Sequence, residues 1–111
     1  MIYNKYCARK TRIDGITFDS KKEADYYCEL KMRRMLGEVK GFDLQVPFEL
    51  QEKFRYNGKA IRAIIYVADF VVTYKDGTKE VIDVKGYRTE GYLLKKKMLL
   101  YKYPDINFVE V

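Results

Sequence analysis

The sequence predicts a single α/β domain of the α+β type, residues 1–111, in which a mixed central sheet is flanked by helices. Three observations predict it. Residues 20–36 have helical spacing, residues 42–85 contain apolar runs separated by turn signals, and residues 89–103 form a second helical segment that Pro104 ends. The predicted order is helix, three antiparallel strands, helix and strand, and a chain of this length can bury one core.

The first elements are a short hairpin or extended segment, followed by a helix. Residues 13–18 contain the turn signal Asp14-Gly15. Asp19 or Ser20 can cap the helix, and Glu23 completes a capping box three residues after Ser20. The predicted apolar stripe of this helix, which Gly37 ends, consists of Ala24, Tyr27, Cys28, Met32 and Met35.

Strand signals begin near residue 42. Two strands, residues 46–56 and 61–74, are separated by Asn57-Gly58, a strong hairpin turn. A third strand, residues 78–85, is apolar on both faces around Val81, which predicts a central position in the sheet. The second helix should carry Leu94, Met98 and Tyr101 on one side, and residues 106–111 should form the last strand.

The loop at residues 75–77 decides how the second and third strands pair. A two-residue loop would place Asp69 opposite Val84, with Asp69 and Asp83 on opposite faces of the sheet. A three-residue loop closed by Gly77 in the left-handed region places Asp69 directly opposite Asp83. Facing Cβ atoms are about 4.5–5.5 Å apart, a spacing at which two carboxylates can share a divalent cation. We predict this second register, with Lys85 on the same face.

The amino-acid composition limits the catalytic groups that the chain could use. The chain has no histidine, which excludes histidine-dependent triads, histidine zinc sites and histidine bases. Hydrolysis would have to rest on carboxylates, lysine and a metal, and oxygen ligands favour Mg²⁺ or Mn²⁺. A net charge of +6 favours a polyanionic partner.

Nothing in the sequence predicts membrane insertion or export. No apolar run approaches the roughly 18–20 residues of a membrane span, and the first residues lack the apolar core of a signal peptide. We therefore expect a cytoplasmic protein with no membrane partner. Cys7 and Cys28 are far apart in the sequence and are expected to be buried thiols without a functional role.

These features together resemble the PD-(D/E)XK nuclease superfamily. The resemblance rests on the element order and on Glu23, Ala68-Asp69 at the end of the second core strand, Asp83-Val84-Lys85 and Lys95-Lys96-Lys97. The segments FDSKKEADYY and VIDVKGYRTEGYLLKKK are similar to the small phage-type endonucleases of that superfamily, which include proteins like Holliday junction resolvases. The resemblance covers about residues 18–111 and implies a restriction-endonuclease-like αβββαβ core. Ala68 replaces a proline that often precedes the first aspartate, but that proline is not a ligand.

The resemblance implies an activity and a set of site residues. It implies a Mg²⁺-dependent DNA endonuclease, with Mn²⁺ able to substitute. Asp69, Asp83 and the Val84 carbonyl would hold the metal, Glu23 would add a carboxylate directly or through water, and Lys85 would position or activate the attacking water. The expected substrate is branched DNA in phage recombination or DNA processing, in the cytoplasm of the host cell if a phage encodes the chain. The expected form is a homodimer.

Further residues of the second helix and the segment before it are expected to contact DNA. These are Tyr87, Arg88, Lys95, Lys96 and Lys97, with Tyr92 as a further candidate.

Several alternatives stay open at this stage. Asp69 and Asp83 can instead be residues of a sheet edge with Lys85 as their ion-pair partner, and Glu23 can be only a capping residue. The three consecutive lysines can be a solvated helix face. A nicking, flap or single-strand nuclease, an RNA-directed nuclease of the same fold, and a non-catalytic DNA-binding accessory protein are the alternative functions.

Overall fold

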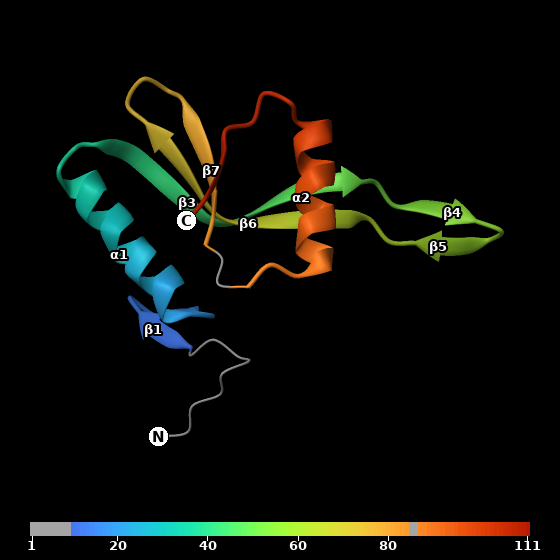
Figure 1. The fold of residues 1–111 in the computed structure, drawn as a ribbon, viewed down its shortest axis with the longest axis horizontal. Coiled ribbons are helices and arrows are strands. Elements are labelled where there is room, and N and C mark those ends of the chain that lie inside the picture. The colour runs from blue at the N-terminus through green and yellow to red at the C-terminus, as the bar shows by residue number, and fades with distance from the viewer. Residues whose placement is uncertain (1–9, 85–86) are drawn as a thin grey trace.

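A four-stranded mixed sheet forms the centre of the protein in the computed structural model, which describes residues 10–84 and 87–111 (Figure 1). Its strand order is β3-β6-β7-β8; β3, β6 and β7 are antiparallel, and β8 is parallel to β7. The elements in chain order are β1 (Thr11–Ile13), β2 (Ile16–Phe18), α1 (Lys21–Met35), β3 (Val39–Gln51), β4 (Phe54–Tyr56), β5 (Lys59–Ile61), β6 (Ile64–Tyr74), β7 (Lys79–Asp83), α2 (Glu90–Lys102) and β8 (Phe108–Glu110). The mixed α+β class and the central position of the third core strand are confirmed.

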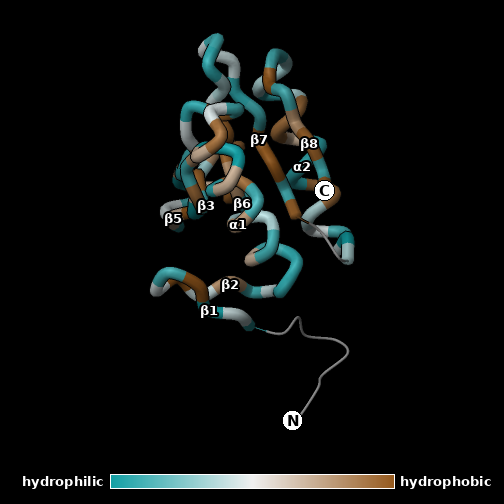
Figure 2. Tube along the Cα trace, turned by 90° about the vertical axis from the view of Figure 1, so that its left-hand side faces the viewer, coloured by the Kyte–Doolittle hydropathy of each residue, from teal (hydrophilic) through white to brown (hydrophobic). Residues whose placement is uncertain are grey.

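The two helices cover opposite faces of this sheet. On one side Leu30 and other α1 residues pack against Phe70 and Ile82, and on the other side Leu99 of α2 packs against Val71 and Val81. Phe70 and Val71 are consecutive, as are Val81 and Ile82, so their side chains point to opposite faces. Part of β7 is coloured hydrophobic in Figure 2, and its two apolar residues, Val81 and Ile82, are both buried, as expected for a strand covered on both faces.

The helix boundaries follow the sequence closely, and Ala24 and Tyr27 of the predicted α1 stripe are buried, but the rest of that stripe is not. Ser20 caps α1, and its Oγ accepts a hydrogen bond of 3.0 Å from the Glu23 N–H. Leu30 is buried, whereas Cys28, Met32 and Met35 of the predicted stripe are exposed. Apolar residues occupy more than one stripe of this helix, so periodicity alone allowed either side to face the sheet.

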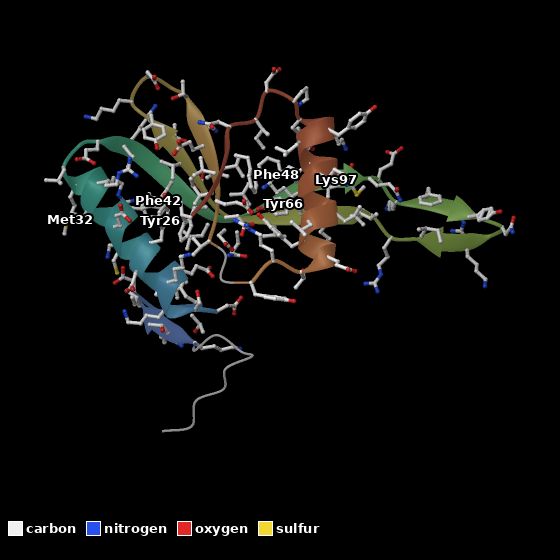
Figure 3. All side chains as sticks on the ribbon, viewed as in Figure 1. Tyr26, Met32, Phe42, Phe48, Tyr66 and Lys97 are labelled. Atoms are coloured by element: carbon white, nitrogen blue, oxygen red, sulfur yellow. The ribbon has the colours of Figure 1, made fainter. Side chains whose placement is uncertain are left out.

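Figure 3 shows the outcome for α1: Tyr26 and Phe42 lie between helix and sheet, and Met32 points away from it. The predicted side of α2 is also wrong in part: Met98 packs against the core, but Leu94 and Tyr101 are exposed, and Tyr92 and Leu99 are the buried residues. The expectation that Cys28 is buried is also wrong, and Cys7 lies outside the described residues. None of the helices described in the structure is long and apolar enough to span a membrane.

The predicted strand that surrounds Asn57-Gly58 is divided. The turn is confirmed: Asn57 and Gly58 both have positive φ, 50° and 77°, as a type I′ hairpin turn requires. However, residues 52–53 and 62–63 interrupt the strands, and β4 and β5 form a separate two-stranded hairpin that projects from the end of the main sheet (Figure 1). We call residues 52–62 the arm.

The three-residue loop at residues 75–77 is confirmed. Tyr74 N–H donates to the Thr78 carbonyl at 2.8 Å, and Gly77 has φ +90°. The strands that follow pair Thr73 with Lys79 and Phe70 with Ile82. Extending this register by one residue on each strand sets Asp69 opposite Asp83.

Gly77→Ala is expected to lower the free energy of unfolding by about 1–2 kcal/mol, because Gly77 is in a left-handed conformation that a Cβ atom disfavours. No surrounding heavy atom lies within 4 Å of the added Cβ, so backbone strain accounts for the cost. Gly41→Ala is the matched control, since that site has equal space and no positive φ. Urea unfolding checks the prediction, and equal stability of the two variants would contradict it.

Candidate active site

The regular alternation of side chains between the two faces of the sheet is interrupted in β6 near Asp69. Ala68 and Val71 pack in the same cluster under α2 although they are three residues apart, whereas regular alternation would put them on opposite faces. Gln45, which the β3 register sets beside this point, has φ +52°. This local distortion lies in the middle of β6, so the prediction that Asp69 ends its strand is wrong.

The carboxylates of Asp69 and Asp83 are held by different donors. Asp83 is only 1% exposed, and its Oδ2 accepts a hydrogen bond from the Tyr66 hydroxyl. Asp69 is partly buried, and its Oδ2 accepts a hydrogen bond of 2.8 Å from the Val84 N–H. The Asp69 side chain on β6 is therefore hydrogen-bonded to the backbone of Val84, the residue that directly follows Asp83.

Two tyrosines around this pair remain neutral hydrogen-bond donors. Burial raises the pKa of Tyr66 strongly, and its hydrogen bond to Asp83 and the negative charge there raise the pKa further. Burial likewise raises the pKa of Tyr92, with additional contributions from its hydrogen bond to Glu110 and from the charge of Asp83. Both phenols therefore stay protonated, and each donates a hydrogen bond to a carboxylate.

Glu110 is a site residue that sequence reasoning missed. It pairs with Asp83 across the parallel strands β7 and β8. Its carboxylate accepts hydrogen bonds from the Tyr92 hydroxyl and, at 3.0 Å, from Lys96 Nζ, and it lies 3.2 Å from the Arg88 guanidinium. The Tyr92 hydrogen bond, followed by that from Lys96, lowers the pKa of Glu110. The available signal was that Glu110 is the only acidic residue in the predicted last strand.

Glu23 reaches the site region through a neighbour. It is buried on α1, and Gln45 Nε2 donates to its Oε1 at 3.4 Å. Among residues 10–84 and 87–111, no group of three or more His, Cys, Asp or Glu residues is arranged to hold a metal ion. The described residues therefore provide the pair Asp69 and Asp83, with Glu23 linked to Gln45. Lys85 lies outside the described residues.

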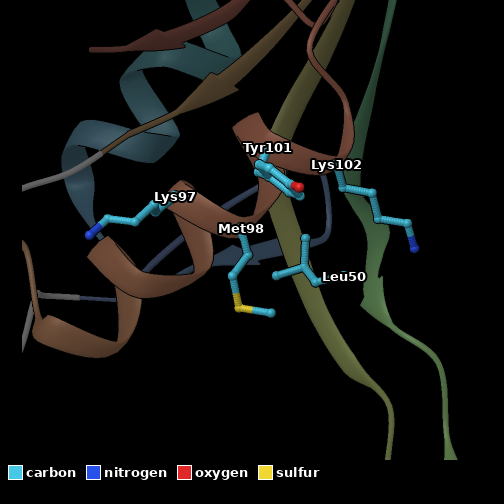
Figure 4. Close-up of a pocket in the computed structure, with 5 residues that line it drawn as sticks. All are labelled: Leu50, Lys97, Met98, Tyr101 and Lys102. Atoms are coloured by element: carbon cyan, nitrogen blue, oxygen red, sulfur yellow. The ribbon is translucent and has the colours of Figure 1, made fainter.

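The three consecutive lysines of α2 lie in three different environments. Lys95 lines a surface pocket of about 430 Å³ together with Asp83, Tyr66 and Tyr92. Lys96 is paired with Glu110, whereas Lys97 lines a separate apolar pocket with Leu50, Met98, Tyr101 and Lys102 (Figure 4). Lys95 thus shares a pocket with Asp83, whereas Lys96 is bound to the neighbouring carboxylate of Glu110.

The two other candidate DNA contacts precede α2. Tyr87 is highly exposed, and Arg88 is partly engaged by Glu110. Both residues lie in the segment that joins β7 to the start of α2, close in sequence to the pocket residue Thr89. Their contact with DNA stays a prediction.

These observations define a mixed α+β protein whose neighbouring central strands carry Asp69 and Asp83, and Asp83 lines a surface pocket. The chain belongs to the family described as "Protein of unknown function (DUF1064)", whose family model matches residues 3–111. No curated protein and no solved structure gives a match.

Proposed function

We propose that this chain is a metal-dependent DNA endonuclease with a restriction-endonuclease-like core, as in the PD-(D/E)XK nucleases that it resembles. The observation that carries the proposal is the register of the two central strands: Phe70 pairs with Ile82, so the next residues along these strands are Asp69 and Asp83, and the Val84 N–H donates to the Asp69 carboxylate. Burying a carboxylate such as Asp83 costs several kcal/mol unless it is compensated by hydrogen bonds, opposite charge or a metal. A structural protein gains little from such an arrangement in the middle of its sheet.

The donor chemistry fits a hard divalent cation. Asp69, Asp83 and the Val84 carbonyl would hold Mg²⁺ or Mn²⁺ through oxygen atoms. When bound, the cation would neutralise the negative charge that develops on the phosphodiester during hydrolysis. The hydrogen bonds from Val84 N–H and the Tyr66 hydroxyl orient the two carboxylates in advance, which reduces the cost of assembling the site.

The other roles in the proposal come from neighbouring residues. Lys85 would position or activate the attacking water, and Glu23 would contribute its carboxylate directly or through water. Glu110, which pairs with Asp83 across β7 and β8, accepts hydrogen bonds from Tyr92 and Lys96 and thereby attaches α2 to the strand next to Asp83. Lys95, on the pocket wall, would contact a substrate phosphate.

The substrate and assembly belong to the same proposal. We propose that the enzyme selects branched DNA, as the similar phage-type endonucleases do, and acts in the cytoplasm during recombination or DNA processing. Cutting two strands symmetrically requires two sites, and a homodimer supplies them.

The decisive experiment incubates the full chain with labelled four-way junction, flap, duplex and single-stranded DNA and with structured RNA. Each substrate is tested with Mg²⁺, Mn²⁺ and EDTA. We expect cleavage of the junction with either metal and none with EDTA. Preference for a flap, a single strand or RNA would replace the substrate assignment. Absence of cleavage with every substrate would contradict the proposed activity and favour a non-catalytic binding protein.

Glu23→Gln separates a metal-site role of Glu23 from a capping role. Gln can accept the same capping bond, so a capping residue would tolerate the change. Because Gln lacks the charge that a cation requires, we expect cleavage at low Mg²⁺ to fall about tenfold or more with a nearly constant melting temperature. Glu29→Gln, an equal charge change at an exposed position of α1, is the control. Near wild-type cleavage by Glu23→Gln would remove Glu23 from the site.

A further inference from the structure

The arm, residues 52–62, is not used by the proposed catalytic site. All its residues are exposed, and its three residue pairs are separate from the central sheet. Its exposed residues include Phe54 and Tyr56, which are 46% and 62% exposed. An isolated two-stranded hairpin is marginally stable and gains little from such exposed aromatic side chains. The arm therefore adds surface to the molecule rather than core.

The charge of that surface is strongly biased. The arm carries four cationic side chains and one carboxylate, Glu52; the cations are Lys53, Arg55, Lys59 and Arg62. Within the described part of the chain, no carboxylate lies within ion-pair distance of these four cations. Arg55 instead donates to the Gly58 carbonyl at 3.1 Å, which holds its guanidinium near the tip of the hairpin. Clustered, uncompensated positive charge is complementary to a polyanion.

The shape of the arm matches one kind of polyanion. Phe54, Tyr56, Lys59 and Ile61 share one face of the hairpin, because the pairs Phe54 with Ile61 and Tyr56 with Lys59 alternate with Arg55 and Ala60. The arm is two strands wide and ends in the compact turn Asn57-Gly58. The major groove of duplex DNA, about 12 Å wide, admits a two-stranded ribbon of this kind.

We propose that the arm is a duplex-binding element, which lies against the groove and phosphates of a double-stranded segment of the substrate. This inference rests on the proposed function, because it requires a DNA substrate. Figure 1 shows the arm projecting beyond α2, at one end of the sheet. It therefore contributes to affinity and placement of the duplex rather than to the reaction at the carboxylate pair. The arm of a second copy is a poor occupant, since it carries the same four cations without a paired carboxylate among the described residues.

Binding of duplex DNA in EDTA at several salt concentrations tests the arm apart from catalysis. The variant is Arg55→Gln with Lys59→Gln, and the matched control is Lys75→Gln with Lys79→Gln, exposed lysines at the opposite end of β6 and at the start of β7. Each lost phosphate contact reduces the magnitude of the slope of log K against log salt by about 0.9. We expect a reduction of about 1–2 for the arm variant and the wild-type slope for the control.

The outcomes distinguish the arm from the nuclease activity. Equal slopes for the two variants, or no binding of duplex by the wild type, would overturn the arm proposal. If the wild type still cleaves DNA with Mg²⁺, the proposed function stands without it. Arm-dependent binding with no cleavage would overturn the nuclease alone. A loss of self-association with an unchanged salt slope would identify the arm as a contact between copies, which also overturns the proposal.

A deletion provides an independent second variant. Gln51 and Ile64 are paired, so residues 52–63 can be replaced by the two-residue turn sequence Asn-Gly between them. The core residues lie outside this segment, and the melting temperature should change little. The deletion should weaken duplex binding at least as much as the double substitution. Unchanged binding by a folded deletion variant would overturn the proposal, and if the deletion unfolds the chain the double substitution decides.

Discussion

Asp83→Asn is expected to abolish phosphodiester cleavage while DNA binding stays constant or becomes stronger. The substitution removes a proposed metal ligand and a negative charge close to the DNA phosphates. Asn keeps the size of the side chain and an oxygen that can accept the Tyr66 hydroxyl, so the fold should persist. Residues that merely support metal ligands change activity by about 10–100-fold, and loss of a ligand should exceed the upper end of that range.

The measurement compares the cleavage rate and the DNA affinity of Asp83→Asn with those of the wild type, in matched preparations. Asp43→Asn is the control, because Asp43 is an exposed carboxylate on β3 of the same sheet. It loses the same charge and should cleave at the wild-type rate. Equal cutting by Asp83→Asn and the wild type would rule out the proposed chemistry, whereas loss of binding together with cleavage would indicate a structural role for Asp83.

Phe70→Ala is expected to lower the free energy of unfolding by about 3–5 kcal/mol. Phe70 is fully buried, and its ring centroid lies 5.4 Å from that of Tyr26 and 6.3 Å from that of Phe42. One side chain therefore connects α1, β3 and β6. Because domains of this size are commonly stable by only about 5–15 kcal/mol, the change removes a large share of the total.

Urea unfolding checks this prediction against Phe54→Ala, which removes the same ring from an exposed position of the arm and should cost little. If Phe70→Ala does not fold, Phe70→Leu supplies a milder test, with an expected loss of about 1–2 kcal/mol. A loss no larger than that of Phe54→Ala would contradict the packing of α1 on this face.

The turns and helix ends could be predicted from the sequence because short-range interactions determine them. Ser20 caps α1 through a bond within its own first turn. The turns Asp14-Gly15 and Asn57-Gly58 place both residues at positive φ, for which Asn, Asp and Gly are suited. Gly77 does the same in the loop before β7, and that loop determines the register of Asp69 and Asp83.

The buried sides of the helices could not be predicted in the same way. Met32 and Leu30 are both apolar and both fit a helical stripe, but only Leu30 packs against the sheet. The choice depends on how the helix is rotated over its partner strands, which local spacing does not specify. The positive φ of Gln45 and the separation of the arm from the central sheet likewise have no signal in the local spacing of apolar residues.

The sequence by itself therefore determined the class of the fold, the loop at Gly77 and the register of β6 with β7. Only the tertiary structure placed Glu110 beside Asp83 and separated Lys95, Lys96 and Lys97 into different environments. The physical reason is the distance along the chain over which each contact forms. A tight turn pairs its own flanking strands, whereas the parallel pairing of β7 with β8 needs a long crossover connection, which here contains α2.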